Sequence, residues 1–281
     1  MKSVILPVAG KGSRLLPLTK ATPKELLPVF DKPVIQFAID EAVAAGAERV
    51  VVVTHSNKPS IAKYFETENG EIHSLRSQEK HSLADVLEAC GSRGEIEVVF
   101  AYQDKPLGLG HAVLCAATDA LDGPVGVILP DDVILGTPCL KEMRTAYKGG
   151  NMVAAMQVPS SQVPKYGIFD ITDNVEAGVP VLAKGMVEKP AIEAAPSNLA
   201  AVGRYILSVE IFEVLEKTGL GAGGEYQLTD AIAKMINSCG LTALPFSGHR
   251  FDCGSHAGLL EASNARYLEM NKSNRTMTAA E

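Results

Sequence analysis

Short apolar runs alternate with segments of helical periodicity along the first half of the chain. Val50 to Val53 form an unbroken β-branched run, which predicts a strand buried on both faces, as in a parallel sheet. Apolar residues recur at helical spacing between Pro33 and Gly46, which are typical start and stop signals for a helix. Strand–helix alternation of this kind indicates an open parallel sheet covered by helices. Further strands are expected at 4–9, 96–102, 125–129 and 152–158, with a helix at 111–121.

The pattern changes after residue 158, where glycine, proline and asparagine become frequent. The sequence therefore predicts the α/β class, with an open, mostly parallel twisted sheet flanked by helices and a small antiparallel elaboration in the second half. One domain is expected over 1–271, ending in a helix at 255–271 and followed by a polar tail at 272–281. The other elements expected here are strands at 168–171, 181–187, 201–207 and 241–246 and helices at 208–217 and 228–238.

The composition of the 281 residues is that of a globular protein, with 46% hydrophobic and 21% charged residues. No apolar run approaches the ~18 residues of a membrane span, so no membrane partner is expected. The net charge of −7 argues against a nucleic-acid partner, because such proteins normally carry a basic field. The first residues lack a signal-peptide pattern and the five cysteines are scattered, so we expect a reduced, cytoplasmic protein.

A glycine-containing loop, Ala9-Gly10-Lys11-Gly12-Ser13-Arg14, follows the first predicted strand. Glycines let the backbone approach a phosphate closely and turn its N–H groups towards the anion. The loop does not match a dinucleotide fingerprint, which requires Gly or Ala where Leu15 stands, nor the phosphate loop that ends in Gly-Lys-Ser/Thr. Taken alone, it could equally be a tight turn after a strand.

Basic residues and prolines alternate after this loop. Prolines at this frequency prevent a long helix and predict a stiff, extended loop. Such a loop suits a polyphosphate, because Arg offers a rigid fork of donors and Lys offers a point charge. A solvated basic loop without a ligand is the simpler alternative. The basic residues are Arg14, Lys20, Lys24 and Lys32, and the prolines are Pro17, Pro23, Pro28 and Pro33.

Three motifs follow one another in this region: Gly10-Lys11-Gly12-Ser13-Arg14-Leu15-Leu16-Pro17-Leu18-Thr19-Lys20, Pro23-Lys24-Glu25-Leu26-Leu27-Pro28 and Asp31-Lys32-Pro33. Together they resemble the signature of bacterial sugar nucleotidyltransferases, and most closely the UTP–glucose-1-phosphate uridylyltransferases (UDP-glucose pyrophosphorylases). The similarity runs from residue 1 to about 270. It implies a Rossmann-like nucleotidyltransferase domain in which 1–158 mainly binds the nucleotide and 159–254 mainly binds the sugar phosphate.

The segment Gln103-Asp104-Lys105-Pro106-Leu107-Gly108-Leu109-Gly110-His111-Ala112 resembles the nucleobase loop of these enzymes. The resemblance places Gln103 and Gly108 at the positions that read the base. A Gln amide carries a donor and an acceptor, which is enough to read one edge of a uracil. Without the resemblance, the segment could be an ordinary strand-to-helix loop.

Pro130-Asp131-Asp132 ends a predicted strand. Neighbouring side chains on a strand point to opposite faces, so only one of the two acids is expected to face a ligand. The resemblance assigns a metal to Asp131 and to Asp252 of Phe251-Asp252-Cys253-Gly254. Mg²⁺ takes one or two carboxylates together with waters and substrate phosphates, so it is the expected cofactor. A helix cap or a solvated turn is the alternative for an Asp pair.

Tyr166-Gly167 and Val187-Glu188-Lys189-Pro190 resemble the sugar-phosphate site of the family, which implies Gly167, Glu188 and Lys189 as sugar-binding residues. A Glu can accept hydrogen bonds from sugar hydroxyls, and a Lys suits a phosphate. Both can reach one ligand only if the strand ends there, which Pro190 favours. A surface Glu–Lys pair on an edge strand is the alternative. The segments 201–205 and 225–230 are also similar to the family and imply sugar contact or support.

The resemblance implies that a uridylyl group passes from UTP to glucose 1-phosphate, giving UDP-glucose and pyrophosphate. Arg14 and Lys24 would stabilise the departing pyrophosphate, and Lys189 would hold the attacking phosphate. The implied partners are thus small-molecule substrates, and a homodimer or homotetramer is expected. The implied catalytic residues are Arg14, Lys24 and Lys189, and the implied nucleotide-binding residues are Ala9, Gly10, Gly12, Ser13, Gln103 and Gly108.

Other activities stay open at this point. A thymidylyltransferase or another glucose-1-phosphate nucleotidyltransferase would share these motifs. A non-catalytic sugar-nucleotide sensor would lose Arg14 or the Asp pair, and both are present. One departure from the family is His256, which stands where a Lys usually follows Asp252-Cys253-Gly254-Ser255.

Overall fold

The computed structural model describes residues 1–66, 69–91, 96–172 and 174–278. Parallel strands in the spatial order β6–β1–β4–β5 form the part of the main sheet that comes from the first half of the chain. Their carboxyl ends therefore meet at one edge of the sheet, where ligands of open α/β sheets bind. These strands are β1 (Ser3–Pro7), β4 (Arg49–Thr54), β5 (Glu97–Tyr102) and β6 (Val125–Ile128).

The second half of the chain extends the same sheet with antiparallel pairs. Strand β12 lies antiparallel to β6 and to β8, whereas β13 is parallel to β8 and antiparallel to β10. Strands β9 and β11 form an antiparallel pair beside β12. The predicted fold class is thus confirmed. These strands are β8 (Asn151–Gln157), β9 (Gly167–Asp170), β10 (Val181–Leu182), β11 (Gly185–Glu188), β12 (Leu199–Leu207) and β13 (Leu241–Pro245).

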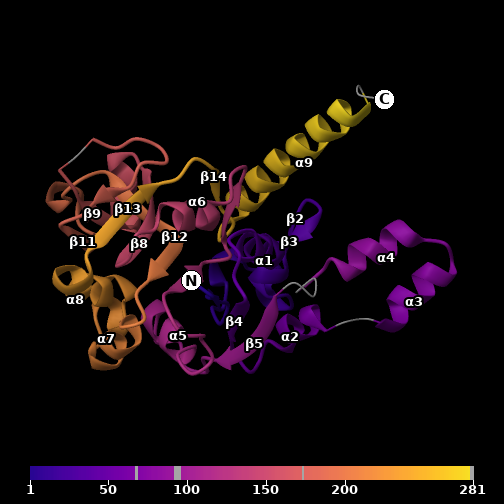
Figure 1. Ribbon diagram of the computed structural model, residues 1–281, viewed down its shortest axis with the longest axis horizontal. Helices are drawn as coiled ribbons and strands as arrows, with labels where there is room; N and C mark the ends of the chain where they lie inside the picture. Colours follow the sequence, from indigo (N-terminus) through magenta and orange to yellow (C-terminus); the bar gives the residue numbers. More distant parts are fainter. Residues whose placement is uncertain (67–68, 92–95, 173, 279–281) are drawn as a thin grey trace.

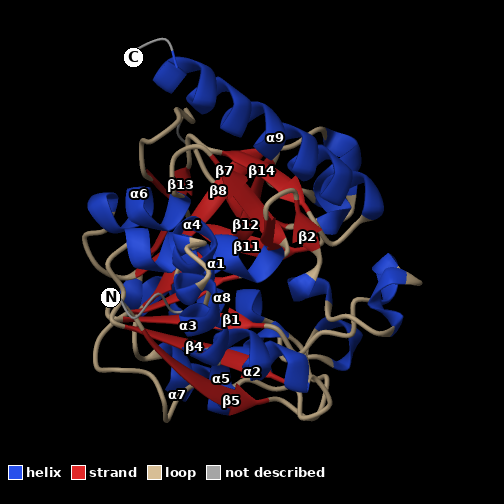
Figure 2. Cartoon of the chain, turned by 90° about the vertical axis from the view of Figure 1, so that its right-hand side faces the viewer, coloured by secondary structure: helices blue, strands red, loops and turns tan. Residues whose placement is uncertain are grey.

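Helices cover both faces of the sheet (Figure 2). Strand β4 shows why, because Val50 and Val52 pack with α1, α2 and α6, whereas Val51 and Val53 pack with α5, α7 and α8. The unbroken apolar run is therefore buried on both sides, as predicted. The described helices are α1 (Val34–Ala44), α2 (Pro59–Phe65), α3 (Asn69–Ser77), α4 (His81–Glu88), α5 (Leu109–Cys115), α6 (Cys139–Ala146), α7 (Ile211–Lys217), α8 (Leu228–Cys239) and α9 (His256–Thr278).

The proline-rich basic segment is folded into short turns instead of running extended. Pro17 and Pro23 each start a 3₁₀ turn, and their carbonyls accept hydrogen bonds from the backbone N–H groups of Lys20 and Leu26 at 3.1 and 2.9 Å. Proline is compatible with such starts because its missing N–H would have no partner there. The turns are η1 (Ser13–Leu15), η2 (Leu18–Lys20) and η3 (Lys24–Leu26).

Two short antiparallel pairs complete the strands: β2 (Pro28–Val29) with β3 (Lys32–Pro33), and β7 (Asp132–Leu135) with β14 (His249–Asp252). None of the four was expected, because elements this short carry little periodicity. The pair of β7 and β14 matters for the site, since it joins Asp132 to Asp252 across 120 positions of the chain.

Helix boundaries differ from expectation at α5 and α9. Helix α5 ends at Cys115 and is followed by turns, although apolar residues continue to Leu121. Helix α9 extends away from the body (Figure 1) and continues to Thr278, past residue 271. Its sequence lacks the glycine and proline that usually stop a helix beyond Gly258.

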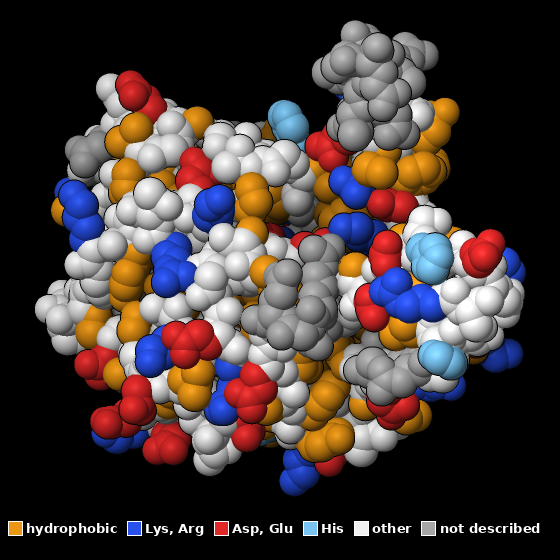
Figure 3. Space-filling model, turned by 45° about the vertical axis from the view of Figure 1, so that its right-hand side comes forward, with side chains coloured by type: hydrophobic (Ala, Val, Ile, Leu, Met, Phe, Trp, Pro, Cys, Tyr) orange, Lys and Arg blue, Asp and Glu red, His pale blue; other side chains and the backbone are white. Residues whose placement is uncertain are grey.

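The surface carries both signs of charge. On the face shown in Figure 3, acidic and basic side chains are interspersed. The hairpin of α3 and α4 stands out from the body on one side (Figure 1). Within the described ranges, no helix combines the length and the apolar character needed to cross a lipid bilayer.

Candidate active site

Two adjoining cavities open near the ends of the central strands. The first cavity, of about 320 Å³, lies beyond the carboxyl ends of β1, β5 and β6. The second cavity, of about 260 Å³, lies against β11 and β12. The two share Leu109, Leu129 and Glu225 as lining residues, so a ligand in one would adjoin a ligand in the other.

Most of the predicted site residues line these cavities, although they come from motifs far apart in the sequence. Arg14 and Asp252 are not among the lining residues but face each other nearby, with Arg14 Nη1 3.6 Å from Asp252 Oδ2. Gly12 and Ser13 also lie outside both linings, at the start of η1. The first cavity is lined by Ala9, Gly10, Lys24, Gln103, Gly108 and Asp131, and the second by Gly167, Glu188 and Lys189.

The glycine loop folds tightly over the basic segment. Gly12 has a φ of 66°, which is the left-handed region that favours glycine. A Cβ at this position would stand 3.1 Å from Thr19 Cγ2 and 3.2 Å from Lys24 Cβ. The hydroxyl of Thr19 donates to Gly12 O at 2.8 Å and holds the loop there. The first two of the three motifs that carried the family resemblance therefore pack against each other.

Lys24 and Asp131 form an ion pair at the floor of the first cavity, with Lys24 Nζ 2.5 Å from Asp131 Oδ2. Burial alone would raise the pKa of Asp131, but the charge of Lys24 and its hydrogen bond hold this pKa below the ordinary value. Burial would lower the pKa of Lys24, but the charge of Asp131 raises it above the ordinary value. Both groups are therefore charged at neutral pH.

A second lysine, Lys58, holds the glycine loop through hydrogen bonds to backbone carbonyls. Its Nζ donates to Val8 O at 2.7 Å, to Gly10 O at 2.5 Å and to Glu25 Oε2 at 3.0 Å. Glu25 is fully buried, and burial raises its pKa while burial lowers the pKa of Lys58. The pair was not predicted, because no local sequence pattern marks a contact between residues 33 positions apart.

The two acids predicted to bind a metal lie on adjacent segments. The backbone N–H of Cys253 donates to Asp131 O at 2.8 Å, which brings the segment after Asp252 against Asp131. No group of three or more His, Cys, Asp or Glu side chains is suitably arranged for a metal within the described chain. A pair of hard carboxylate oxygens fits Mg²⁺, which takes one or two carboxylates and completes its shell with water and phosphate. It does not fit zinc, which prefers nitrogen and sulfur.

Asp132 is held differently from its neighbour Asp131. Its Oδ1 accepts a hydrogen bond from Arg250 Nε at 2.8 Å, and its Oδ2 accepts one from Gly203 N at 3.0 Å. Arg250 also donates to the Tyr166 hydroxyl at 2.9 Å. Asp132 lines the second cavity and Asp131 the first, so the two acids do face opposite ways. No role was predicted for Asp132 or Arg250 from the sequence.

A buried ion pair fixes the turn that carries both acids. Arg204 is 1% exposed, and its Nη2 lies 2.9 Å from Glu41 Oε2. Arg204 also donates to Leu129 O at 3.1 Å and to Asp132 O at 2.7 Å. Glu41 in turn accepts a hydrogen bond from Leu140 N at 2.8 Å. The backbone of the turn is therefore held by a buried guanidinium.

The second cavity is lined by a carboxylate, an ammonium and a threonine. Strand β11 ends at Glu188, and Lys189 follows with a φ of 44°, so both side chains line the cavity as the sequence required. Lys189 Nζ lies 3.1 Å from Glu188 Oε1. A Cβ on Gly167 would stand 3.3 Å from Glu188 Oε2. Thr229 also lines the cavity, and its buried Oγ1 has no hydrogen-bond partner among the described residues.

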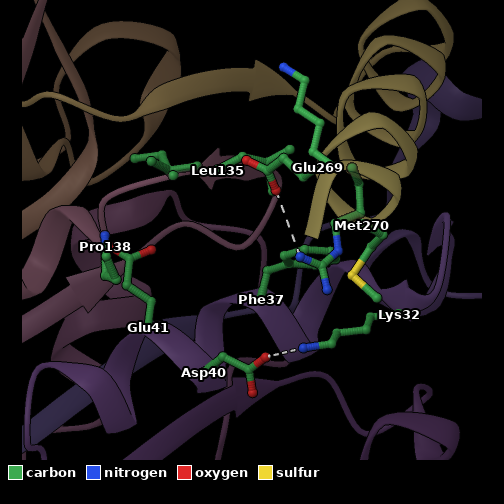
Figure 4. Close-up of a pocket in the computed structure, with 12 residues that line it drawn as sticks. Lys32, Phe37, Asp40, Glu41, Leu135, Pro138, Glu269 and Met270 are labelled. Atoms are coloured by element: carbon green, nitrogen blue, oxygen red, sulfur yellow. Dashed lines mark hydrogen bonds and ion pairs between the residues drawn. The ribbon is translucent and has the colours of Figure 1, made fainter. Parts of the chain in front are cut away.

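A larger cavity of about 510 Å³ lies elsewhere, between α1, β7 and α9 (Figure 4). Its charged side chains are largely paired with one another, as in the contact between Lys32 and Asp40 at 2.7 Å. Arg266 similarly lies 3.7 Å from Glu269. None of the predicted site residues lines this cavity, so size alone does not identify the candidate site.

Comparison with known proteins supports the same family. The family model described as nucleotidyl transferase matches residues 2–268. A UTP–glucose-1-phosphate uridylyltransferase from Haemophilus ducreyi is 41% identical over 268 residues, covering 92% of this chain and 90% of that protein. A structure described as a UTP-bound UGPase from Acinetobacter baumannii is 36% identical, with a TM-score of 0.87 and 99% of each chain covered.

A second structure, a UDP-glucose pyrophosphorylase complexed with UDP-glucose, is 38% identical, with a TM-score of 0.82 and coverage of 96% of this chain and 99% of that one. The resemblance found in the sequence is confirmed by these matches along nearly the whole chain. The chain therefore belongs to the nucleotidyl transferase family.

Proposed function

We propose that the chain transfers a uridylyl group from UTP to glucose 1-phosphate, releasing pyrophosphate and forming UDP-glucose. The observation that carries this proposal is the pair of adjoining cavities. One joins the glycine loop to Gln103, and the other joins Glu188 to Lys189. The relatives named for this reaction and the neighbours bound to UTP and UDP-glucose support it.

The proposed chemistry needs no general base. An oxygen of glucose 1-phosphate is already ionised at neutral pH and attacks the α-phosphorus of UTP, while the bond to the β-phosphate oxygen breaks. Catalysis then consists of positioning two anions in line and neutralising their charge. The second cavity would hold the attacking phosphate with Lys189 and orient the hydroxyls with Glu188. Arg14 and Lys24 would meet the departing pyrophosphate.

The nucleotide would lie in the first cavity, with its phosphates against the backbone of Ala9 and Gly10. Gly12 and Ser13 would act by shaping this loop, because they lie outside the cavity lining. Asp131 and Asp252 would hold Mg²⁺, which when bound supplies positive charge to phosphate oxygens. Lys24 keeps Asp131 ionised and so keeps it able to act as a ligand.

A substrate panel tests the proposal. The purified protein is incubated with Mg²⁺, with UTP, dTTP, CTP or ATP, and with glucose or galactose 1-phosphate, and pyrophosphate release is measured. The highest kcat/KM is expected for UTP with glucose 1-phosphate, together with formation of UDP-glucose. A clear preference for dTTP would make the chain a thymidylyltransferase. No release from any pair would leave a binding protein and contradict the proposal.

A further inference from the structure

The side-chain amide of Gln103 is held by two contacts to its nitrogen. Gln103 follows β5, where its backbone N–H donates to Thr54 O at 2.8 Å, and the residue lines the first cavity while only 7% exposed. Its side-chain nitrogen Nε2 lies 3.0 Å from Gly108 O and 3.0 Å from His111 Nδ1. Both partners belong to the loop and helix that follow β5, so a single local segment holds the amide.

These two contacts decide which end of the amide faces the cavity. A backbone carbonyl can only accept, so the group that faces Gly108 O is the NH₂ of Gln103. An amide NH₂ can only donate, so Nδ1 of His111 carries the lone pair and the ring proton sits on Nε2. The NH₂ has two hydrogens and can serve both acceptors. The carbonyl oxygen Oε1 of Gln103, with no hydrogen bond to the described residues, is left for a ligand.

The surroundings of His111 favour its neutral ring. Burial lowers the pKa of His111, and the ammonium of Lys105 lowers it further. The other titratable groups nearby are Cys115, whose Sγ lies 3.7 Å from Nδ1, and Tyr226, whose ring centroid lies 5.9 Å away. Cys115 lies on the same helix as His111, and burial and then the charge of Asp104 raise the pKa of its thiol. A neutral ring is what the contact with an amide NH₂ requires.

We propose that His111 is a positioning residue that sets the choice of base by holding Gln103 so that only an acceptor faces the nucleotide. The proposal rests on the proposed function, since it concerns the base of the nucleotide substrate. Uracil presents an N–H between its two carbonyls and can donate to Oε1 of Gln103. Cytosine has a lone pair at that ring atom and would be repelled, unless the amide turned and gave up both of its contacts.

Two substitutions separate this role from mere packing. His111→Phe keeps a ring but removes Nδ1. The amide of Gln103 then gives up only its contact with Gly108 O when it turns, instead of two contacts. The preference for UTP over CTP, measured as the ratio of dissociation constants, should fall about fivefold, the worth of one neutral hydrogen bond. His111→Asn supplies an acceptor oxygen in a similar place and should restore most of the preference. Circular dichroism shows whether each variant is folded.

The unsubstituted protein offers a second measurement. Protonation places an N–H on Nδ1 opposite the amide NH₂, which favours the turned amide. The preference for UTP over CTP should therefore weaken as the pH falls from about 8 to about 5. His111→Asn is the matched control, because it has no titrating ring and should show a constant preference. The same pH profile in both proteins would overturn the proposal.

Binding and turnover distinguish the two ideas. If UTP binds in preference to CTP, folded His111→Phe loses that preference and glucose 1-phosphate is not converted, the proposed function fails and the assignment of His111 stands. If UDP-glucose forms but folded His111→Phe keeps the full preference, the function stands and the assignment of His111 is wrong. A protein that never prefers UTP to CTP contradicts the assignment as well.

Discussion

At the scale of single residues, cations and acids rest against one another around the two cavities. Lys24 pairs with Asp131, and Lys189 with Glu188. Arg14 approaches Asp252 more loosely. A bound nucleotide or sugar phosphate would either bridge these ion pairs or replace one partner of a pair. The paired charges partly offset one another before substrates arrive, which lowers the cost of burying them.

Replacement of Arg14 tests its link to the leaving group. Arg14→Ala should lower kcat at least about tenfold, or 1.4 kcal/mol. It should weaken UDP-glucose binding much less, because that product lacks the pyrophosphate. Lys20→Ala is the control, since Lys20 is an exposed cation on the same segment. Equal losses in turnover and in product binding would show that Arg14 only holds the nucleotide or the fold.

The metal assignment makes its own prediction. Asp131→Asn removes one of the two proposed carboxylate ligands and should lower kcat at least ~10²-fold, about 2.7 kcal/mol of barrier. Chelation by EDTA should abolish activity, and added Mg²⁺ should restore it. The exposed Asp122→Asn serves as control. Undiminished turnover in EDTA, or near-normal turnover in Asp131→Asn, would remove the metal from the account.

Sugar selection should be divided between Glu188 and Lys189. A site that hydrogen-bonds hydroxyls can reject a poor match by as much as ~10⁴, because its polar groups go unpaired. Glu188→Ala should therefore narrow the gap in kcat/KM between glucose and galactose 1-phosphates. Lys189→Ala should raise KM for both alike, since Lys189 is proposed to bind the phosphate that the two substrates share.

A direct UTP titration of both variants completes this test. UTP affinity should change little in either, because the nucleotide is proposed to bind in the first cavity, which neither residue lines. Full discrimination in Glu188→Ala, or loss of UTP affinity in Lys189→Ala, would show that the division is wrong.

At the scale of elements, buried ion pairs tie the site loops to the scaffold. Lys58, at the start of α2, holds the loop after β1 through Gly10 O. Glu41 of α1 holds Arg204 of β12, which in turn holds the backbone of the turn after β6. Lys58 contacts its loop directly, whereas Glu41 acts on its turn through Arg204, so in both cases a helix helps to set the geometry of a segment that carries predicted site residues.

The Glu41–Arg204 pair should be costly to break. Glu41→Ala leaves the guanidinium of Arg204 buried without its counter-charge, which typically costs about 3–5 kcal/mol. We expect the free energy of unfolding in urea to fall by this amount, whereas the exposed Glu48→Ala should leave it nearly unchanged. A loss under about 1 kcal/mol would mean that water reaches the pair.

The same elements show what the sequence can and cannot reveal. The burial of Val50 to Val53 is predictable from the sequence, because it follows from a local pattern. Alternating apolar and polar residues indicate a strand buried on one face, and an unbroken apolar run indicates a strand buried on both. Asp131 and Glu188 were found through motifs. The contacts of Glu41 with Arg204 and of Asp132 with Arg250 span 163 and 118 positions. Nothing in the local pattern pairs such residues, so only the folded sheet reveals them.

At the scale of the whole molecule, the two halves of the chain meet at the site. Glu225, from the second half, lines both cavities, and β12 lies beside β6 from the first half. The division of labour between 1–158 and 159–254 and the homodimer or homotetramer stay predictions. Light scattering of the purified protein measures the latter directly. A monomer at micromolar concentration would contradict it.

The central claim is a direct, in-line transfer between ligands held in adjoining cavities. The stereochemistry at the α-phosphorus tests it most directly. One pure diastereomer of UTP with sulfur at the α-phosphate is converted with glucose 1-phosphate, and the configuration of the thio-UDP-glucose is determined. A single displacement predicts inversion. Retention would require a covalent intermediate and an even number of displacements, and would contradict the account, as would the absence of a UDP-glucose product.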